Sequence, residues 1–391
     1  MPDAYIVAAK RTAGGRRKGA LSGWHPADLC AQVVDHMVEA TGADPAAIDD
    51  VIVGCVGQAG EQSFNIGRNV VLASSLPETV PGTSVDRQCG SSQQAMHFAA
   101  QAVMSGTQDM VIAAGVESMT RVPMGLAYTL PKKNGLGTYI SPNIQTRYPG
   151  IEFSQFDGAE TIARKYGFSR ERLDAFAQQS HERAANAAER GQFDDEILPV
   201  ASKTPDGDTG EMHTRDEGVR AGSTVEALAE LDPIVEGGLL TAGNASQMCD
   251  GASAVMVVNE TGLEALGVEP IARIHHMSVY GGDPVVMLET PIEATRRALS
   301  KAGMTLDDID LFEVNEAFAP IPLAFIEALG ADPSKVNVRG GAIALGHPLG
   351  ATGTKLMTTL VHALQKRGAR YGLQTMCEGG GLANVTLVER L

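Results

Sequence analysis

Two pairs of segments in this chain repeat each other at one constant offset of 261 residues. Residues 47–53 correspond to residues 308–314, and residues 110–118 correspond to residues 371–379. Because both pairs keep the same register, chance similarity between short segments explains them poorly. We therefore predict two homologous halves. This restricts the chain to folds that consist of two similar units.

Each half alternates between helical and strand patterns. Apolar residues recur at helical spacing in residues 28–39 and 90–104, whereas residues 51–56 and 110–114 are the short apolar runs of strands buried on both faces. The segment 385–389 predicts a strand with one face in contact with water. This alternation predicts an α/β protein with mostly parallel sheets and with helices packed outside them.

The region 120–249 interrupts the duplication and is richer in polar residues, proline and glycine. Its one strong helical pattern covers residues 170–189. We expect residues 1–119 to form the N-terminal half, completed by about residues 250–268, and residues 269–391 to form the C-terminal half. A long insertion in a duplicated core is a natural place for a lid or a substrate-recognition segment.

Composition excludes several classes of function. The formal net charge of -16 disfavours nucleic acid, whose binding depends on cationic side chains that neutralise phosphates. No stretch of about 18 apolar residues predicts a membrane span, and the first residues carry no signal-peptide pattern. The five cysteines lack disulfide-framework spacing, which favours a reducing compartment, so we expect a cytoplasmic protein. No metal-ligand cluster and no nicotinamide site is visible.

The densest glycine segment, residues 337–353, surrounds a single histidine, His347. Glycines allow backbone to approach a ligand closely, so the segment predicts a site for something small. A P-loop is excluded because Thr354 separates Gly353 from Lys355, and no dinucleotide-binding glycine triplet follows a strand. A purely structural glycine turn remains the alternative.

Cys89 lies where a buried strand pattern ends and a helical pattern begins. A helix N-terminus favours the thiolate, so we expect a lowered pKa for this thiol, and the small residues 90–92 leave room for a bulky electrophile. A buried structural cysteine is the alternative. The 261-residue offset places Cys89 opposite Gly350, close to His347, so Cys89, His347 and Cys377 could meet near a pseudo-twofold axis.

Four motifs together resemble the thiolase family, and the resemblance covers essentially the whole chain. They are Asp86-Arg-Gln-Cys-Gly-Ser-Ser92, Asn315-Glu-Ala-Phe-Ala319, the glycine segment around His347, and Cys377-Glu-Gly-Gly-Gly381. The resemblance implies two duplicated βαβ-type halves in a layered α-β-α-β-α fold with an inserted loop domain. It also implies CoA-dependent cleavage of 3-oxoacyl-CoA, or the reverse Claisen condensation, in a homodimer or homotetramer. Coenzyme A would be a substrate, with no permanently bound cofactor and no metal.

The resemblance assigns roles to five residues. Cys89 would be the nucleophile that becomes acylated, His347 would activate its thiol, and Cys377 would exchange protons with the acetyl α-carbon or with incoming CoA. Two cysteines are needed because a thiolate that has become a thioester can no longer act as a base. Asn315 would hold a water that forms one oxyanion hole with His347. The backbone N–H groups of Cys89 and Gly379 would form the other.

Three further residues resemble family contacts to the substrate. Ser246 would contact pantetheine, Arg220 would lie near the CoA nucleotide, and Met287 would line the acyl pocket. Solvated loop positions for the first two, and a core position for the methionine, are the alternatives. The remaining cysteines have no matching role, and we interpret them as structural: Cys30, Cys55 and Cys249.

One segment departs from part of the family. Acetoacetyl-specific members carry a His-Met-Gly element in the inserted region, whereas residues 153–160 here contain no histidine. The chain resembles instead degradative members that accept longer or bulkier acyl groups, including ring-derived ones, with acetoacetyl-CoA thiolase as the alternative. A ketoacyl-synthase-type enzyme would lack an equivalent of Cys377. A non-catalytic protein that binds acyl-CoA or lipid would be expected to lose one of the reactive groups.

Overall fold

The computed structural model describes residues 2–391, and it confirms the predicted duplication. Helices α3 and α13 begin 261 residues apart, at Ser91 and Thr352, and the strands that follow them keep the same offset. Six elements of the first half have counterparts in the second: β1 (Tyr5–Thr12) and β10 (Ala272–Gly281), α1 (Pro26–Thr41) and α10 (Thr290–Ala302), β3 (Asp50–Gly54) and β11 (Leu311–Val314), α3 (Ser91–Ser105) and α13 (Thr352–Arg367), β5 (Met110–Ser118) and β12 (Tyr371–Glu378), β9 (Cys249–Val258) and β13 (Leu382–Arg390).

The strands follow one continuous path, in the order β11-β12-β13-β10-β1-β9-β5-β3-β4, where β4 is Gly82–Val85. The two halves of this path mirror each other and join where Tyr5 and Ile6 of β1 pair with β10. Two short strands, β2 (Gly15–Arg16) and β6 (Ile197–Leu198), extend it beside β9 and β1.

The expectation of mostly parallel sheets is wrong, because parallel and antiparallel pairs are mixed. Strands β3, β4 and β5 are parallel, as are β11 and β12, since helices connect them. Strands β9 and β13 run antiparallel to their neighbours. Strand β9 returns from the inserted region, and β13 follows β12 through a tight turn that reverses the chain.

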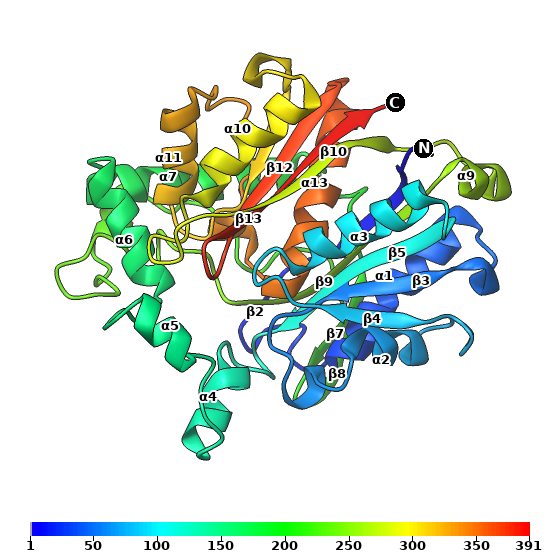
Figure 1. Ribbon diagram of the computed structural model, residues 1–391, viewed down its shortest axis with the longest axis horizontal. Coiled ribbons are helices and arrows are strands. Elements are labelled where there is room, and N and C mark those ends of the chain that lie inside the picture. The colour runs from blue at the N-terminus through cyan, green and yellow to red at the C-terminus, as the bar shows by residue number, and fades with distance from the viewer. Residues whose placement is uncertain (1) are drawn as a thin grey trace.

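Five layers result from this arrangement (Figure 1). Helices α3 and α13 form the central layer between the two halves of the sheet, where their apolar residues share one core cluster with inward-facing residues of β5, β9 and β13. Helices α1 and α2 (Ile66–Ala73) cover the outer face of the N-terminal half. Helices α10 and α11 (Pro320–Leu329) cover the C-terminal half. The predicted α-β-α-β-α architecture is confirmed.

Strand β13 has no face in contact with water, which corrects the prediction for residues 385–389. Thr386, which suggested a wetter face, is fully buried against the central layer. Its hydroxyl accepts a hydrogen bond from the Gln93 amide at 2.7 Å and lies 2.7 Å from Nε2 of His97. A polar partner on α3 therefore replaces water.

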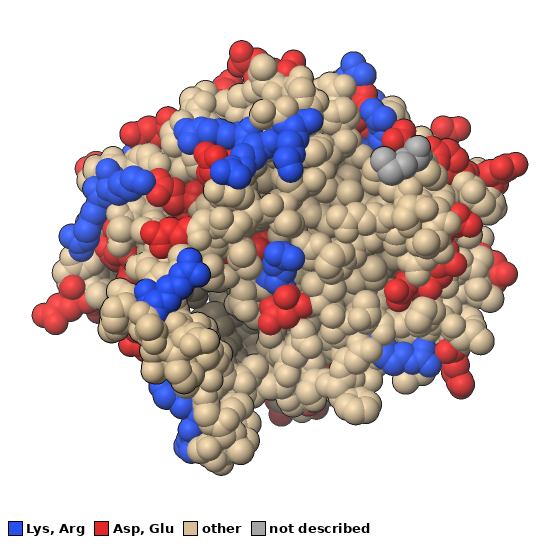
Figure 2. Space-filling model, in the orientation of Figure 1, with Lys and Arg blue, Asp and Glu red and all other residues tan. Residues whose placement is uncertain are grey.

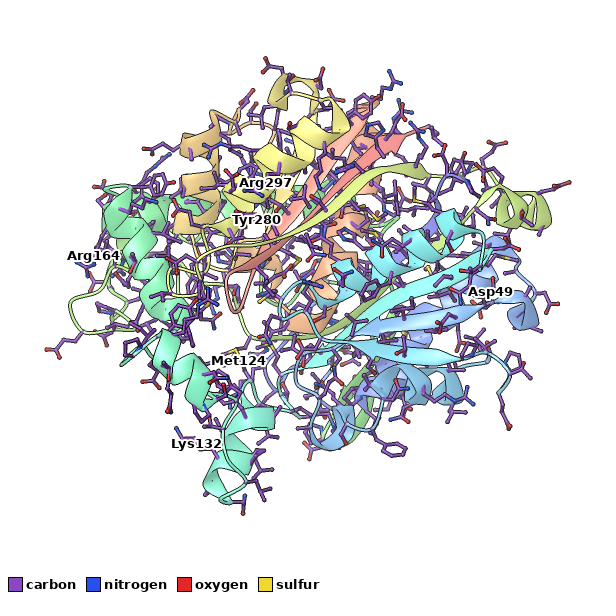
Figure 3. All side chains as sticks on the ribbon, viewed as in Figure 1. Asp49, Met124, Lys132, Arg164, Tyr280 and Arg297 are labelled. Carbon is purple, nitrogen blue, oxygen red and sulfur yellow. The ribbon has the colours of Figure 1, made fainter. Side chains whose placement is uncertain are left out.

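The inserted region adds five helices and a separate two-stranded sheet of β7 (Val200–Thr204) and β8 (Gly207–His213). The predicted helix 170–189 is α7 (Arg170–Glu189), and the others are α4 (Leu126–Lys133), α5 (Pro142–Arg147), α6 (Gln155–Lys165) and α8 (Val225–Ala229). Helices α4 and α5 project from the body as an arm, near which Figure 3 labels Met124 and Lys132. The face drawn in Figure 2 is hollowed beside this arm, and acidic and basic side chains are interspersed around it.

A buried ionic network ties the inserted region to the core. The guanidinium of Arg11 on β1 contacts Glu196 at 2.8 Å and Asp216 at 2.8 Å, and Arg339 contacts Glu196 at 3.0 Å. Both carboxylates come from the inserted region. The network therefore fixes this region against both halves of the duplicated core.

Replacing Arg11 should be strongly destabilising. Arg11→Ala leaves Glu196 and Asp216 buried without their shared cation, so we expect the free energy of unfolding to fall by about 3–5 kcal/mol. Arg16→Ala is the matched control, since Arg16 makes a solvent-exposed pair with Glu217 and should cost at most about 1 kcal/mol. Denaturant unfolding monitored by circular dichroism measures both values, and equal losses would contradict a stabilising role for the buried network.

Candidate active site

Cys89 lies in a tight turn between β4 and α3. Gln88 has a positive φ of 49°, which is uncommon for a residue other than glycine, and Gly90 caps the helix. The Ser91 hydroxyl donates to the Gln88 carbonyl at 2.6 Å and accepts from the Arg87 N–H at 3.0 Å. The turn thus fixes Cys89 immediately before the helix, where the sequence predicted it.

The predicted lowering of the Cys89 pKa is wrong for the resting protein. Burial of the thiol, reinforced by the neighbouring Glu378, raises its pKa to about 12. Cys89 precedes the helix cap, so the free N–H groups of the first turn do not outweigh the loss of solvation. A base is therefore required to form the thiolate.

His347 is the candidate for that base, because its hydrogen bonds select one tautomer. Its Nδ1 lies 2.6 Å from the Thr352 hydroxyl, which itself donates its only proton to the Pro348 carbonyl at 2.9 Å. Nδ1 must therefore carry a proton and donate it to Thr352. Nε2 keeps its lone pair and lies 3.4 Å from the Asn315 amide nitrogen.

The charge state of His347 agrees with this assignment. Burial, with Lys355 nearby, lowers the pKa of the imidazole to about 3, so the resting ring is neutral. The Lys355 ammonium donates to the carbonyls of Leu345 at 2.5 Å and Gly346 at 3.0 Å, which fixes the loop just before His347. In a neutral ring whose Nε2 lone pair accepts only the long hydrogen bond from the Asn315 amide, that nitrogen can take the proton of a thiol.

Asn315 follows β11 and is held by its backbone N–H, which donates to Thr375 of β12 at 3.1 Å. Its side-chain Oδ1 is buried and has no hydrogen-bond partner in residues 2–391. Buried polar atoms are normally satisfied by protein or ordered water. An unpaired amide oxygen beside His347 therefore fits a position that holds a water.

Cys377 lies at the end of β12, and burial together with the neighbouring Cys89 and Glu378 raises its pKa well above the usual value. The two cysteines are therefore close enough for their charges to interact. The hairpin after Cys377 also contacts the turn of the first cysteine, because a Cβ atom at Gly379 would lie 2.9 Å from the Gln88 side-chain oxygen. Across the described chain, the N–H groups of Cys89 and Gly379 donate to no side chain and no loop carbonyl.

The three predicted substrate contacts make no hydrogen bond to Cys89, His347 or Cys377 in residues 2–391. Ser246 donates its N–H to Ala317 at 2.9 Å, two residues after Asn315. Met287 is buried, has a positive φ of 62° and belongs to the same apolar cluster as Cys377. Arg220 is exposed, farther along the inserted region, and its N–H donates to Nδ1 of His181 at 3.2 Å.

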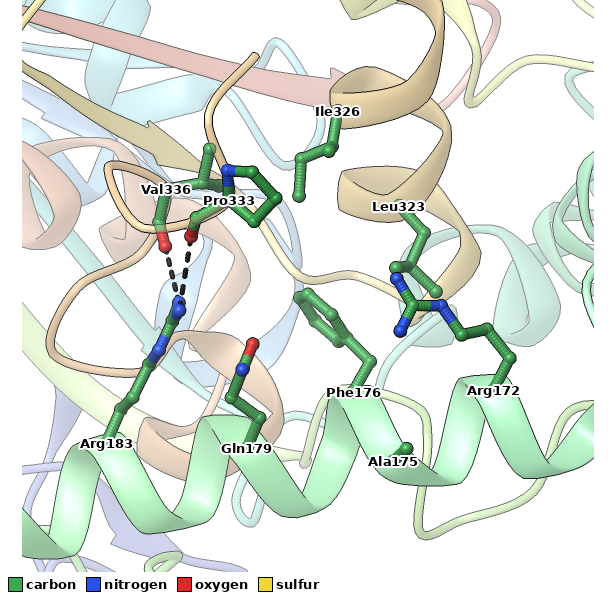
Figure 4. A pocket seen from close by; sticks show the side chains of 9 residues that line it. All are labelled: Arg172, Ala175, Phe176, Gln179, Arg183, Leu323, Ile326, Pro333 and Val336. Carbon is green, nitrogen blue, oxygen red and sulfur yellow. Dashed lines mark hydrogen bonds between the residues drawn. The ribbon is translucent and has the colours of Figure 1, made fainter. Parts of the chain in front are cut away.

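A separate cavity of about 250 Å³ lies between α7 and α11 (Figure 4). Its wall includes the apolar side chains of Phe176, Leu323 and Ile326, and Arg183 donates there to the Val336 and Pro333 carbonyls. None of the predicted site residues lines it. This cavity is therefore distinct from the cysteine–histidine cluster.

Sequence reasoning missed several residues around the cluster. Thr352 and Lys355 follow His347 by five and eight residues in the same segment. This short separation could have indicated that they contact His347 or its loop. Glu378 flanks Cys377, and Glu117 is its counterpart at the 261-residue offset. The repeat could have paired these two glutamates, but it could not have shown what surrounds each of them.

Comparison with known proteins shows the family. The thiolase N-terminal domain matches residues 4–261, and the thiolase C-terminal domain matches residues 268–390. This chain belongs to the thiolase family. It is a thiolase acyltransferase, and relatives named 3-ketoacyl-CoA thiolase place it with the degradative members, as the sequence predicted.

Three relatives illustrate the similarity. A steroid 3-ketoacyl-CoA thiolase of Mycobacterium tuberculosis is 51% identical, covering 100% of this chain and 95% of the relative. A 3-ketoacyl-CoA thiolase of Bacillus subtilis is 42% identical over 100% of both chains. The crystal structure of an acetyl-CoA acetyltransferase from Bacillus anthracis superposes with a TM-score of 0.91 at 35% identity, covering 100% of this chain and 99% of that one.

Two kinds of feature are absent from the described residues. No helix in residues 2–391 is long and apolar enough to cross a membrane. The same residues contain no group of three or more histidine, cysteine or carboxylate side chains that could hold a metal ion.

The hydroxyl of Thr352 should be required for the His347 tautomer. Thr352→Val removes the acceptor for Nδ1–H, so we expect kcat/KM to fall by about 10- to 100-fold, the usual cost of one lost buried hydrogen bond. Thr352→Ser keeps the hydroxyl and should recover most of this loss. Steady-state kinetics on the three proteins distinguishes the cases, and equal impairment of both variants would show that packing, not the hydroxyl, is what matters.

Proposed function

We propose that this protein cleaves 3-oxoacyl-CoA with coenzyme A, giving acetyl-CoA or another short acyl-CoA and a shortened acyl-CoA, through an acyl-thioester on Cys89. The observation that carries the proposal is the neutral His347, whose unprotonated Nε2 faces the Asn315 amide at 3.4 Å, while the Asn315 N–H donates to Thr375 on the strand that contains Cys377. The reaction is reversible, so the same site supports Claisen condensation.

In the proposed first half-reaction, Nε2 of His347 takes the thiol proton and the Cys89 sulfur attacks the C3 carbonyl carbon. The C2–C3 bond then breaks, and the acetyl-CoA enolate takes a proton from Cys377. The acyl group remains on Cys89 as a thioester. Once protonated, His347 can donate from Nε2 toward the developing oxyanion, together with a water on Asn315.

In the proposed second half-reaction, the Cys377 thiolate takes the proton of incoming CoA. The CoA sulfur attacks the thioester carbon, and the Cys89 sulfur leaves and regains its proton from His347. The unpaired N–H groups of Cys89 and Gly379 support this step, because they can donate to the thioester oxygen. No bound cofactor takes part, and coenzyme A is a substrate.

An apolar wall from the inserted region supports a bulky acyl group. Phe156 of α6 lies edge-on to Phe318, at 5.6 Å between ring centroids, and Phe318 is three residues from Asn315. Helix α6 also packs closely on the Met287 segment, because a Cβ atom at Gly158 would lie 2.6 Å from the Val286 carbonyl. We propose that residues 120–249 recognise the substrate and that Met287 lines the acyl pocket.

A panel of 3-oxoacyl-CoA substrates tests this specificity. We expect kcat/KM for medium, long or ring-bearing acyl groups to exceed that for acetoacetyl-CoA, following the similarity to the steroid thiolase. A preference for acetoacetyl-CoA would favour the alternative, an acetyl-CoA C-acetyltransferase. Tight acyl-CoA binding with no thiolysis of any substrate would favour the remote alternative, a non-catalytic binding protein.

Arg220 should affect binding of CoA more than chemistry, because its exposed guanidinium is proposed to contact the nucleotide and Ser246 the pantetheine. Arg220→Ala should raise KM for CoA by up to about fivefold, the range of an exposed ionic contact. A pantetheine-truncated thiol should show a smaller change. Arg215→Ala, at an exposed arginine of the same segment, is the matched control. Equal losses with both thiols would argue against a nucleotide contact.

We also propose a homodimer or homotetramer. The strand β4 is an unpaired sheet edge, and the Phe64 side chain beside the α2 segment that packs on it is 92% exposed. Analytical ultracentrifugation would settle the oligomeric state.

A cytoplasmic location is proposed from the five cysteines, all of which are free thiols.

A further inference from the structure

The duplication gives the strand of Cys377 an internal counterpart. Strands β5 and β12 are equivalent, and Glu117 near the end of β5 corresponds to Glu378 at the end of β12. Both side chains are buried, with 2% and 0% of their surface exposed. Differences between the two carboxyl groups therefore show how the two halves have diverged from each other.

Glu117 is fully satisfied by hydrogen bonds. It accepts from the N–H groups of Val56 at 2.9 Å, Gly57 at 3.0 Å and Gly350 at 2.9 Å, and from the Gln62 amide at 2.7 Å. Gly350 is the position that corresponds to Cys89. Burial raises the pKa of this group, the four donors oppose that shift by favouring the carboxylate, and the group fixes the loop after His347.

Glu378 has the same place in the other half but no such partners. Neither carboxyl oxygen has a hydrogen-bond partner in residues 2–391. The group packs directly on the residue after the nucleophile, because a Cβ atom at Gly90 would lie 2.0 Å from Oε1 of Glu378. The space that the small residue Gly90 was expected to leave for substrate is therefore filled by this carboxyl group.

Few charged groups act on Glu378. Arg87 is the one cation that lowers its pKa, although in residues 2–391 neither Glu378 carboxyl oxygen nor Nε of Arg87 has a hydrogen-bond partner. Cys89 and Cys377 are the titratable groups whose pKa values Glu378 raises, and Asp86 and Glu117 act more weakly on Cys89. The two nearby histidines, His97 on α3 and His276 on β10, do not act on it.

The electrostatic consequence is a competition for negative charge. Burial raises the pKa of Glu378 to about 8, with Arg87 opposing the shift, so the group is largely neutral at neutral pH. Two adjacent buried groups cannot both ionise readily, because each like charge disfavours the other. A thiolate at Cys89 and a carboxylate at Glu378 are therefore mutually unfavourable.

We propose that Glu378 acts on the reaction through the neighbouring thiols: as a neutral acid it permits the Cys89 thiolate, and as a carboxylate it suppresses it. This inference rests on the proposed function, in which Cys89 is the nucleophile. Glu378 is thus a positioning residue that acts through its charge on the thiols. Its ionisation limits the reactivity of Cys89 at alkaline pH. Glu117 has four donors that favour its carboxylate, so we expect no such pH-dependent effect from it.

Alkylation of Cys89 by iodoacetamide tests the inference in the intact protein, because only the thiolate reacts. Rates are measured from about pH 6.5 to about pH 9.5 by mass spectrometry of the Cys89 peptide. The ratio of the Glu378→Gln rate to the rate of the natural protein should be about one at the acid end. At the alkaline end it should reach about tenfold or more, which corresponds to a change of one unit in the pKa of the Cys89 thiol. The matched control Glu117→Gln should show a ratio that is constant with pH.

The outcomes separate this inference from the function on which it rests. A constant ratio for Glu378→Gln, with alkylation still at Cys89, would overturn the role of Glu378 alone. Preferential alkylation of another cysteine would overturn the assignment of Cys89 and this inference with it. Glu378→Met, which is also neutral, should reproduce the pH-dependent ratio if the glutamine variant misfolds. Misfolding of both variants would show that the carboxyl group serves the fold, contrary to the proposal.

Discussion

His347→Ala will lose acylation of Cys89. In the proposed mechanism the substitution removes the Nε2 lone pair that takes the thiol proton, and the thiol pKa of about 12 leaves almost no thiolate without a base. It also removes a donor to the oxyanion. General-base catalysis contributes about 10²- to 10⁴-fold, and one oxyanion donor about 10²- to 10³-fold, so we expect a loss of at least about 10⁴-fold.

Rapid-quench measurement of acyl-enzyme in a single turnover tests this expectation. Asn315→Ala is the comparison variant, because it removes only the water-holding amide and should slow acylation by about a hundredfold. Normal burst acylation in His347→Ala would contradict the role assigned to the histidine.

Cys377→Ala will separate acylation from turnover. Cys89 and His347 are unchanged in this variant, and the acetyl-CoA enolate of the first half-reaction can take its proton from water instead of Cys377, so acyl-enzyme should still form in a single turnover, although more slowly. Deacylation needs a group that takes the proton of incoming CoA, so steady-state thiolysis should fall by about 10³-fold or more. The acyl group should therefore accumulate on the protein.

Cys30→Ala provides the control, since Cys30 is a buried cysteine of α1, distant in sequence from Cys89 and Cys377. This variant should leave acylation and turnover close to normal. Equal loss of acylation and turnover in Cys377→Ala would contradict the separation, because it would mean that this cysteine is as necessary for forming the thioester as for cleaving it.

The sequence was sufficient for features that are encoded locally or by the repeat. Helix α7 has the predicted bounds because its apolar spacing and its Ser169 cap are both local signals. The turn of Cys89 was predicted from a strand pattern that meets a helix pattern. The offset of 261 residues was enough to predict the duplicated architecture.

Features that depend on contacts between distant segments were not predictable. Thr386 suggested a wet strand face because its partners, Gln93 and His97, lie on α3, far away in sequence. The Cys89 pKa was predicted in the wrong direction because burial by β12 and its Glu378 is a property of the assembled core. The repeat aligns Glu117 with Glu378, but only the structure shows that one has four donors and the other none.

The central claim is that this thiolase works through an acyl-thioester on Cys89. The most direct measurement is mass spectrometry of peptides from the protein quenched at acid pH after brief incubation with a 3-oxoacyl-CoA and no added CoA. We expect a mass increase equal to the shortened acyl group on the peptide that contains Cys89, and no such increase on the peptide of Cys377. Acylation of Cys377 instead, or thiolysis with no acylated peptide at all, would contradict this claim.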